Sequence, residues 1–188
     1  SYENKYFPVL KNKKALEKLK SDESTNVSWE RLGHYKVRWG STKNDFFARY
    51  PKKNFKELKT NVFYQESPLG RYHQRTTLYF SPKDTLEKIQ LLITDSTKKA
   101  SDLLGYVIKI NERVSGIPQS SGVTKCPGFK HFQAYIWNSR DNFEMIAQFR
   151  GRPYQIRMVR RSPASLPKPM DYCHVVPDLL DYSPKKNK

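Results

Sequence analysis

The sequence predicts an α+β protein with a central antiparallel β-sheet flanked by helices, and three observations lead to this class. Its 188 residues fit one domain with an appendage. Apolar residues make up 37% and aromatic residues 13%, enough for a hydrophobic core and against global disorder. From residue 71 onward, strand-like and helix-like segments follow one another in the order β-α-β-β-α-β-α.

A strand and a helix are the first predicted elements of this region. Residues 76–80 are rich in threonine and aromatic side chains, which favours a strand. Residues 81–84 place a proline and an acidic residue where helices commonly begin. Leu86, Ile89 and Ile93 then recur at helical spacing, so we predict a helix after residue 81.

The middle of the region is predicted as strand, loop and strand. Residues 101–104 extend or restart the preceding helix, and residues 106–110 are β-rich. Glycine and proline punctuate residues 115–128, which predicts a loop. Residues 131–137 form the next predicted strand.

The last predicted elements are a helix, a strand and a short terminal helix. Apolar residues recur at helical spacing over residues 141–149. Residues 154–160 alternate as a strand does, and the proline-rich residues 162–169 connect that strand to a short helix containing Tyr172.

The first part of the chain differs in character, so we predict a basic, aromatic N-terminal extension at residues 1–70 and a domain at residues 71–188. Within the extension, a short stretch alternates as a strand, with Tyr35, Val37 and Trp39 on one face. The extension either enlarges a DNA-binding surface or packs over one face of the sheet, and both interpretations stay open.

The charge of the chain points to a polyanionic partner. Lys and Arg number 35 and Asp and Glu 18, which gives a formal net charge of +17. This balance favours DNA and RNA first and an anionic membrane surface second, with a solubilising surface as the alternative. The basic residues are mixed with Tyr, Phe and Trp, a pattern that suits single strands, whose bases stack on aromatic rings while cations hold the phosphates.

Two further observations restrict the class. No apolar run approaches the roughly 18–20 residues needed to span a bilayer, so we predict no membrane-spanning segment. Cys126 and Cys173 could form one bridge at most, and we expect free thiols in a reducing, intracellular compartment.

One group of residues could support metal-dependent chemistry. His131 and Gln133 are two positions apart on a predicted strand, so their side chains share a face, and both can bind a divalent metal. Glu112 follows the preceding predicted strand and approaches the same face if the two strands pair. The hydroxyl of Tyr172 could attack phosphorus if a metal polarises the phosphoryl oxygen.

In their order, these elements resemble the HUH endonuclease domain of replication-initiator (Rep) proteins from circular single-stranded-DNA viruses, a ferredoxin-like or RRM-like fold. Residues 105–112 are similar to the family's Glu-bearing strand, and residues 131–136 to its metal motif in the His-x-Gln form. Residues 171–173 are similar to its Tyr-Cys nucleophile motif. The resemblance covers about residues 71–180.

The resemblance implies an origin-nicking endonuclease and strand transferase. Mn²⁺ or Mg²⁺ would be held by Glu112, His131 and Gln133. Tyr172 would form a covalent 5′-phosphotyrosine and leave a 3′ hydroxyl for rolling-circle replication. The implied partners are single-stranded DNA of an origin hairpin and a helicase domain in full-length relatives, and a viral member would act in the host nucleus. Val175 stands where the family usually has a lysine after the tyrosine.

A basic segment near the C-terminus is predicted to contact phosphates, with a solvated strand and loop as the alternative. The predicted nucleic-acid-binding residues are Arg150, Arg152, Arg157, Arg160, Arg161 and Lys168.

A second hypothesis belongs to a different class. A non-catalytic, basic nucleic-acid-binding protein, such as a ribosomal or organellar RNA-binding protein or a viral packaging or matrix protein, would have the same charge and aromatic content. The discriminating feature is whether the three predicted metal ligands and Tyr172 converge, because a pure binding protein gives them no reason to meet.

Overall fold

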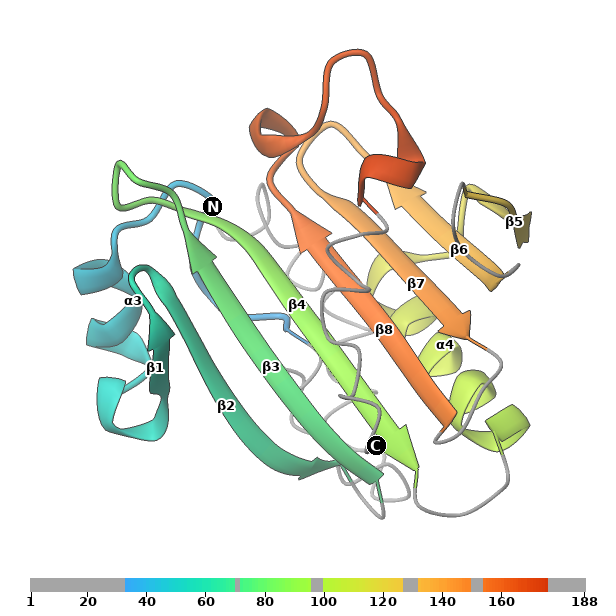
Figure 1. Cartoon of the computed structure of the whole chain (residues 1–188), viewed down its shortest axis with the longest axis horizontal. Coiled ribbons are helices and arrows are strands. Elements are labelled where there is room, and N and C mark those ends of the chain that lie inside the picture. The colour runs from blue at the N-terminus through green and yellow to red at the C-terminus, as the bar shows by residue number, and fades with distance from the viewer. Residues whose placement is uncertain (1–32, 70–71, 96–99, 127–131, 150–153, 176–188) are drawn as a thin grey trace, which may run out of the picture.

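The structure, a computed structural model, describes residues 33–69, 72–95, 100–126, 132–149 and 154–175. Eight strands form one antiparallel sheet in the order β1-β2-β3-β4-β8-β7-β6-β5 (Figure 1). The strands are β1 (Lys56–Lys59), β2 (Val62–Leu69), β3 (Tyr72–Phe80), β4 (Leu86–Asp95), β5 (Ser120–Thr124), β6 (Phe132–Asn138), β7 (Phe143–Phe149) and β8 (Tyr154–Arg161). The α-helices with named bounds are α3 (Lys43–Arg49) and α4 (Ala100–Ser115), and the short 3₁₀ helices are η3 (Lys52–Asn54) and η4 (Pro163–Ser165).

The predicted class, α+β with a central antiparallel sheet, is confirmed at that level. The strands predicted over residues 76–80, 131–137 and 154–160 correspond to β3, β6 and β8. Sheet dominates this fold, and the predicted loop at residues 115–128 contains the edge strand β5.

The prediction of a helix after residue 81 is wrong, because the segment forms β4. β4 lies between β3 and β8 and buries residues on both faces, which removes the polar alternation by which a strand is recognised. Its leucines and isoleucines then satisfy a helical spacing as well. The preceding residues close a turn: Asp84 has φ 63° and its N–H donates to Ser81 O at 2.9 Å.

Two other predictions exchange helix and strand. Residues 141–149, predicted as a helix, contain β7, which is again a central strand buried on both faces. Residues 106–110, predicted as a strand, lie inside α4. Leu104, Val107 and Ile108 recur at helical spacing there and pack against the main core. α4 has 16 residues, and no helix in the described ranges is long and apolar enough to cross a membrane.

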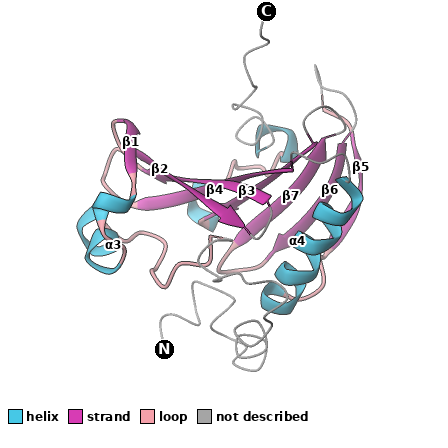
Figure 2. Cartoon of the chain, turned by 90° about the horizontal axis from the view of Figure 1, so that it is seen from below, coloured by secondary structure: helices cyan, strands magenta, loops and turns pink. Residues whose placement is uncertain are grey.

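One face of the sheet, which we call the helical face, carries α3, α4 and residues 33–40 (Figure 2). Tyr35, Val37 and Trp39 are buried on this face, as their alternation predicts. Residues 33–40 nevertheless form turns and bends, so the predicted strand is wrong. The alternation identified the buried side of the segment without identifying its backbone conformation.

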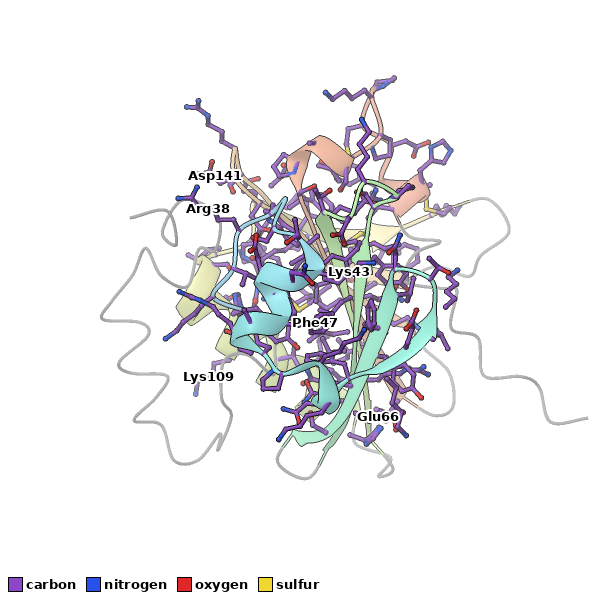
Figure 3. All side chains as sticks on the ribbon, turned by 90° about the vertical axis from the view of Figure 1, so that its left-hand side faces the viewer. Arg38, Lys43, Phe47, Glu66, Lys109 and Asp141 are labelled. Carbon is purple, nitrogen blue, oxygen red and sulfur yellow. A yellow bond between two sulfur atoms is a disulfide. The ribbon has the colours of Figure 1, made fainter. Side chains whose placement is uncertain are left out.

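α3 attaches to this face through aromatic rings. The hydroxyl of Thr42 caps the helix by accepting from Asp45 N at 3.2 Å. Phe46 is fully buried, with its ring 5.1 Å from that of Tyr35, and Phe47 lies between α3 and the sheet, 5.1 Å from the ring of Phe63 (Figure 3). These distances are typical of edge-on aromatic pairs.

The predicted domain boundary at residue 70 falls between β2 and β3, which pair along their full length from Val62 with Tyr79 to Leu69 with Tyr72. Residues 33–69 therefore share one sheet and one core with the residues that follow, and they are not a separate extension. Of the two interpretations of the N-terminal region, packing over a sheet face fits the described aromatic residues before β1, among them Tyr35, Trp39 and Phe46. Residues 1–32 lie outside the described ranges.

On the opposite face, a second core covers β6, β7 and β8 and includes Phe132, Phe143 and Val159. The chain after β8 packs on this core through Leu166 and Met170. Its end is a short helical turn at residues 172–175, seen on the far side of the sheet from α4 in Figure 2.

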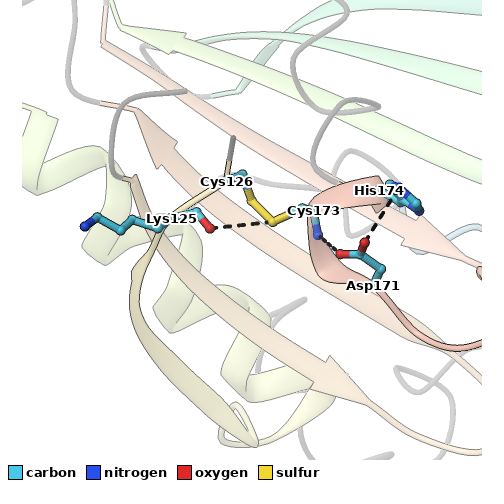
Figure 4. The surroundings of a disulfide bond; sticks show 5 residues. All are labelled: Lys125, Cys126, Asp171, Cys173 and His174. Carbon is cyan, nitrogen blue, oxygen red and sulfur yellow. Dashed lines mark hydrogen bonds and ion pairs between the residues drawn. A yellow bond between two sulfur atoms is a disulfide. The ribbon is translucent and has the colours of Figure 1, made fainter. Parts of the chain in front are cut away.

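A disulfide fastens this terminal turn. Cys126 and Cys173 are bonded across a sequence separation of 47, so the prediction of free thiols is wrong (Figure 4). The Sγ of Cys173 lies 3.6 Å from Lys125 O, and the Cys173 N–H donates to Asp171 Oδ1 at 2.9 Å. The disulfide thereby links the turn to the residues that follow β5, while Val175 packs the turn on the second core.

Candidate nucleic-acid interface

One predicted metal ligand, Glu112, does not occupy the position expected of it. Glu112 lies on α4 rather than at the end of a strand, and its side chain is exposed. Strand pairing therefore does not bring Glu112 beside Gln133, which lies on β6 as predicted. His131 lies outside the described residues.

Gln133 and Tyr172 lie on opposite sides of the sheet. Phe132 and Ala134 belong to the second core, so the intervening Gln133 points to the helical face. Tyr172 is on the other side, with its ring 6.3 Å from that of Phe143. The residues present thus do not fit a metal shared with the tyrosine, and the described residues contain no group of three or more His, Cys, Asp and Glu that could hold a metal ion.

Val175 holds the turn that carries Tyr172 against the second core. Its side chain is fully buried in the second core, at the position where the resembled family usually has a lysine. A lysine would not be tolerated at this site without a partner, because the cost of burying an unpaired ammonium is high. The terminal turn is therefore built to pack on the sheet through this residue.

Most described members of the predicted phosphate-binding set have structural roles. Arg160 is 1% exposed and Arg157 4%, so neither can reach a phosphate in this arrangement. Arg161 is half-buried and donates from Nε to Ser165 Oγ at 3.2 Å, which ties η4 to the end of β8. Lys168 is exposed. Arg150 and Arg152 lie outside the described residues.

Arg160 belongs to a buried ion pair on the helical face. Its Nη1 lies 2.6 Å from Glu144 Oε1, and each side chain is 1% exposed. Three neutral groups also donate hydrogen bonds to the Glu144 carboxylate: Asn111 Nδ2 at 2.9 Å, Asn142 Nδ2 at 2.7 Å and Ser115 Oγ at 2.9 Å. A buried charge is tolerated only when paired and hydrogen-bonded in this way, so this network serves the fold.

His34 contacts the same network from the segment before α3. His34 Nε2 faces both the guanidinium of Arg160 and, at 3.3 Å, Oδ1 of Asn111. Burial, and secondly the charge of Arg160, hold the pKa of His34 well below its ordinary value of 6.5, while a hydrogen bond with Asn111 opposes them. Burial likewise lowers the pKa of Arg160 below its ordinary value, against the opposing effect of Glu144.

The remaining large surface of the sheet is polar. The strands β1–β4 turn one set of side chains away from α3 and α4, and we call this set the polar face. Its members form cross-strand rows, as the pairing of Thr77 with Tyr64 and Gln90 shows. The residues of the polar face are Lys56, Lys59, Val62, Tyr64, Glu66, His73, Arg75, Thr77, Tyr79, Lys88, Gln90 and Leu92.

Two cation–aromatic pairs stand on the polar face. The guanidinium carbon of Arg75 lies 4.0 Å from the ring centroid of Tyr64, and Lys88 Nζ lies 3.9 Å from that of Tyr79. Both tyrosines are half-buried. Rings and cations side by side on a sheet are the combination that binds single-stranded nucleic acid, through base stacking and phosphate contacts.

A hollow of about 190 Å³ lies within the polar face. Its cations are Lys59 and Arg75, its aromatic residue is Tyr79, and Gln90 and Thr77 contribute polar side chains. Figure 2 shows the β1 end of the sheet rising on the side of the terminal turn, which makes this face concave.

A second cavity, of about 400 Å³, lies where the β3–β4 turn, the β6–β7 turn and η4 meet Trp39. Its lining combines Glu87 and Asp141 with Arg140. The carboxylates there disfavour a polyanion. The cations of the polar face make it the more favourable of the two surfaces for a nucleic acid.

Part of the polar face could be predicted from the sequence. The predicted strand at residues 76–80 places Thr77 and Tyr79 on one side, because side chains two positions apart share a face of a strand. Lys88 was missed because β4 was predicted as a helix.

A scan against family models, a search of curated proteins and a search of solved structures each found no match.

Proposed function

We propose that this protein is a non-catalytic, basic nucleic-acid-binding protein that holds single strands on its polar face. The observation that carries the proposal is the pair of cation–aromatic contacts, Arg75 on Tyr64 and Lys88 on Tyr79, on one concave sheet surface. The net charge of +17 supports it, since phosphate contacts supply most of non-specific affinity.

The separation of the residues expected to do chemistry also supports a binding role. Tyr172 and Gln133 lie on opposite sides of the sheet, and Glu112 points from a helix to solvent. Convergence of these groups was the feature that discriminates a nuclease from a binding protein.

The test removes two charges in each of two places. Lys56→Ser/Lys59→Ser removes two exposed lysines of β1 on the polar face. The control, Lys109→Ser/Lys168→Ser, removes two exposed lysines that are not on the polar face. Figure 3 shows Lys109 across the molecule from Glu66 of the polar face. Binding of a labelled single strand is followed by fluorescence anisotropy over a range of salt concentrations. We expect the β1 variant alone to reduce the slope of log K against log[salt], by about 0.7 for each phosphate that is no longer neutralised by a lysine. Equal slopes for both variants would contradict a site on the polar face.

A tyrosine nuclease, as the resemblance implies, is the second proposal, and the observation in its favour is Tyr172. The side chain is 38% exposed in a helical turn, as a nucleophile requires. The protein is incubated with Mn²⁺ and labelled single-stranded DNA hairpins, and a denaturation-resistant adduct is sought. An adduct that disappears in Tyr172→Phe and with EDTA would establish the nuclease. Tight binding without an adduct would support the binding function.

A further inference from the structure

The hollow on the polar face has a buried floor and an exposed rim. Its floor consists of two apolar and two polar side chains, those of Val62, Leu92, Thr77 and Gln90. Its rim includes the exposed Leu58 and Lys59 of β1. Apolar surface next to a few polar groups that fix orientation is the usual lining of a small-ligand site.

The volume sets the size of the ligand. The hollow measures about 190 Å³, below the roughly 300 Å³ at which sites for drug-sized ligands begin. One planar heterocycle fits this space, whereas a stacked double helix does not. The face of that heterocycle would lie against the ring of Tyr79 and the aliphatic side chains of Val62 and Leu92. All three residues line the hollow, and Val62 pairs with Tyr79 across β2 and β3.

The polar groups set its chemistry. Gln90 Oε1 accepts from the Tyr79 hydroxyl at 3.2 Å, and the same side-chain amide carries two donors on Nε2. The Thr77 hydroxyl can donate or accept beside it. Such groups match the edge of a nucleobase, which carries carbonyl and ring-nitrogen acceptors next to amino donors.

Cations flank the hollow where a phosphate would follow the base. Lys59 and Arg75 line the hollow. Lys88 of β4 lies over the ring of Tyr79, which belongs to the neighbouring strand β3. The guanidinium of Arg75, held 4.0 Å from the centroid of Tyr64, also offers a plane on which a neighbouring base can stack.

We propose that this hollow is a base pocket that accepts one unpaired nucleobase of a bound single strand, with Tyr79 on its face, Gln90 and Thr77 at its edge, and Lys59 and Arg75 beside the adjoining phosphates. This inference rests on the proposed function and adds to it a specific requirement for bases. A surface that recognised phosphates alone would bind a strand without bases equally well.

The experiment separates bases from phosphates. Labelled oligothymidylate, oligouridylate and an abasic oligonucleotide of the same length are titrated with the intact chain at fixed salt. We expect the wild type to bind at least one of the two base-bearing strands about tenfold more tightly than the abasic strand, since stacking of one base contributes that much. The arm that binds more tightly identifies the DNA or RNA preference.

Three variants locate the effect. Tyr79→Leu and Gln90→Met keep side-chain bulk but remove the ring and the amide, and both should lose affinity for the base-bearing strands more than for the abasic strand. Tyr135→Leu removes a half-buried tyrosine of β6 on the helical face, away from the hollow, and should keep the preference for bases. Equal losses of the preference in Tyr135→Leu and Tyr79→Leu would overturn the pocket.

The remaining outcomes distinguish the two proposals. Equal affinity of the wild type for base-bearing and abasic strands would overturn the pocket and leave the nucleic-acid-binding function standing. Binding of none of the strands would overturn both. Because a variant could misfold, the wild type is also photocrosslinked to strands containing 4-thiothymidine or 4-thiouridine. Crosslinks should map to the peptide containing Tyr79, and crosslinks confined to other peptides would refute the pocket.

Discussion

On the helical face, the charge of Arg160 is enclosed with Glu144 and neutral amides, whereas on the polar face Arg75 and Lys88 lie against tyrosine rings near the surface. The first arrangement pairs a cation on β8 with a carboxylate on β7, and the second has its cations on β3 and β4 of the same sheet. They differ in what covers them. α4 and residues 33–40 cover the first, and the described helices leave the second uncovered (Figure 2).

This difference teaches that the role of an arginine in a strand is decided by how far its surroundings enclose it. In β8, Arg160 faces α4 and pairs with Glu144, while Arg157 and Arg161 face the other way, where Arg157 is also buried. An enclosed cation must be fully partnered and then contributes to the integrity of the fold. A cation against a half-buried ring near the surface keeps polar atoms that a phosphate can approach.

The largest expected effect comes from breaking the enclosed pair. Arg160→Met leaves the Glu144 carboxylate buried without its cation, and we expect the free energy of unfolding to fall by about 3–5 kcal/mol. The matched variant Arg75→Met on the polar face should cost about 1 kcal/mol, the value of an exposed cation–aromatic contact. Guanidinium denaturation followed by circular dichroism measures both.

The double variant Arg160→Met/Glu144→Leu is the control for this pair, because it removes both charges and should recover part of the loss. Equal destabilisation by Arg160→Met and Arg75→Met would contradict the distinction between the two faces.

A second effect separates the terminal turn from the polar face. Cys126→Ser/Cys173→Ser removes a crosslink that closes a loop with a sequence separation of 47, and chain entropy makes this worth up to about 4 kcal/mol of unfolding free energy. We expect thermal denaturation to show that loss while affinity for a single strand at lower temperature stays unchanged. A parallel loss of affinity in the folded variant would place the binding surface at the turn instead.

The smallest effect is a pH dependence from the helical face. Because the pKa of His34 is lowered in the folded protein, the unfolded chain takes up a proton near pH 6.5 that the folded chain does not. Stability is therefore complete above about pH 6.5 and falls as the pH drops below it, by at most about 1.4 kcal/mol per pH unit.

Denaturation at a series of pH values should show this slope reduced in His34→Gln. His73→Gln, on the exposed polar face, is the matched control. An unchanged slope in His34→Gln would show that the buried histidine is not its source.

Local pattern was enough for several elements of the fold. It predicted the strands β3, β6 and β8, the last of them from its alternation, and the buried side of residues 35–39. It failed where a strand lies in the middle of the sheet, because β4 and β7 are buried on both faces and their apolar spacing fits two periods. It also failed for α4, whose valine and isoleucine residues favour a strand locally, although packing against the sheet stabilises a helix there.

The sequence by itself determined the antiparallel α+β class, the basic charge and the aromatic content, because these depend on composition and short-range periodicity. Only the tertiary structure decided that Gln133 and Tyr172 are separated by the sheet, that Cys126 meets Cys173, and that Arg160 is buried. Strand order and side-chain face depend on pairings between distant residues, and a shift of one position reverses every side chain of a strand.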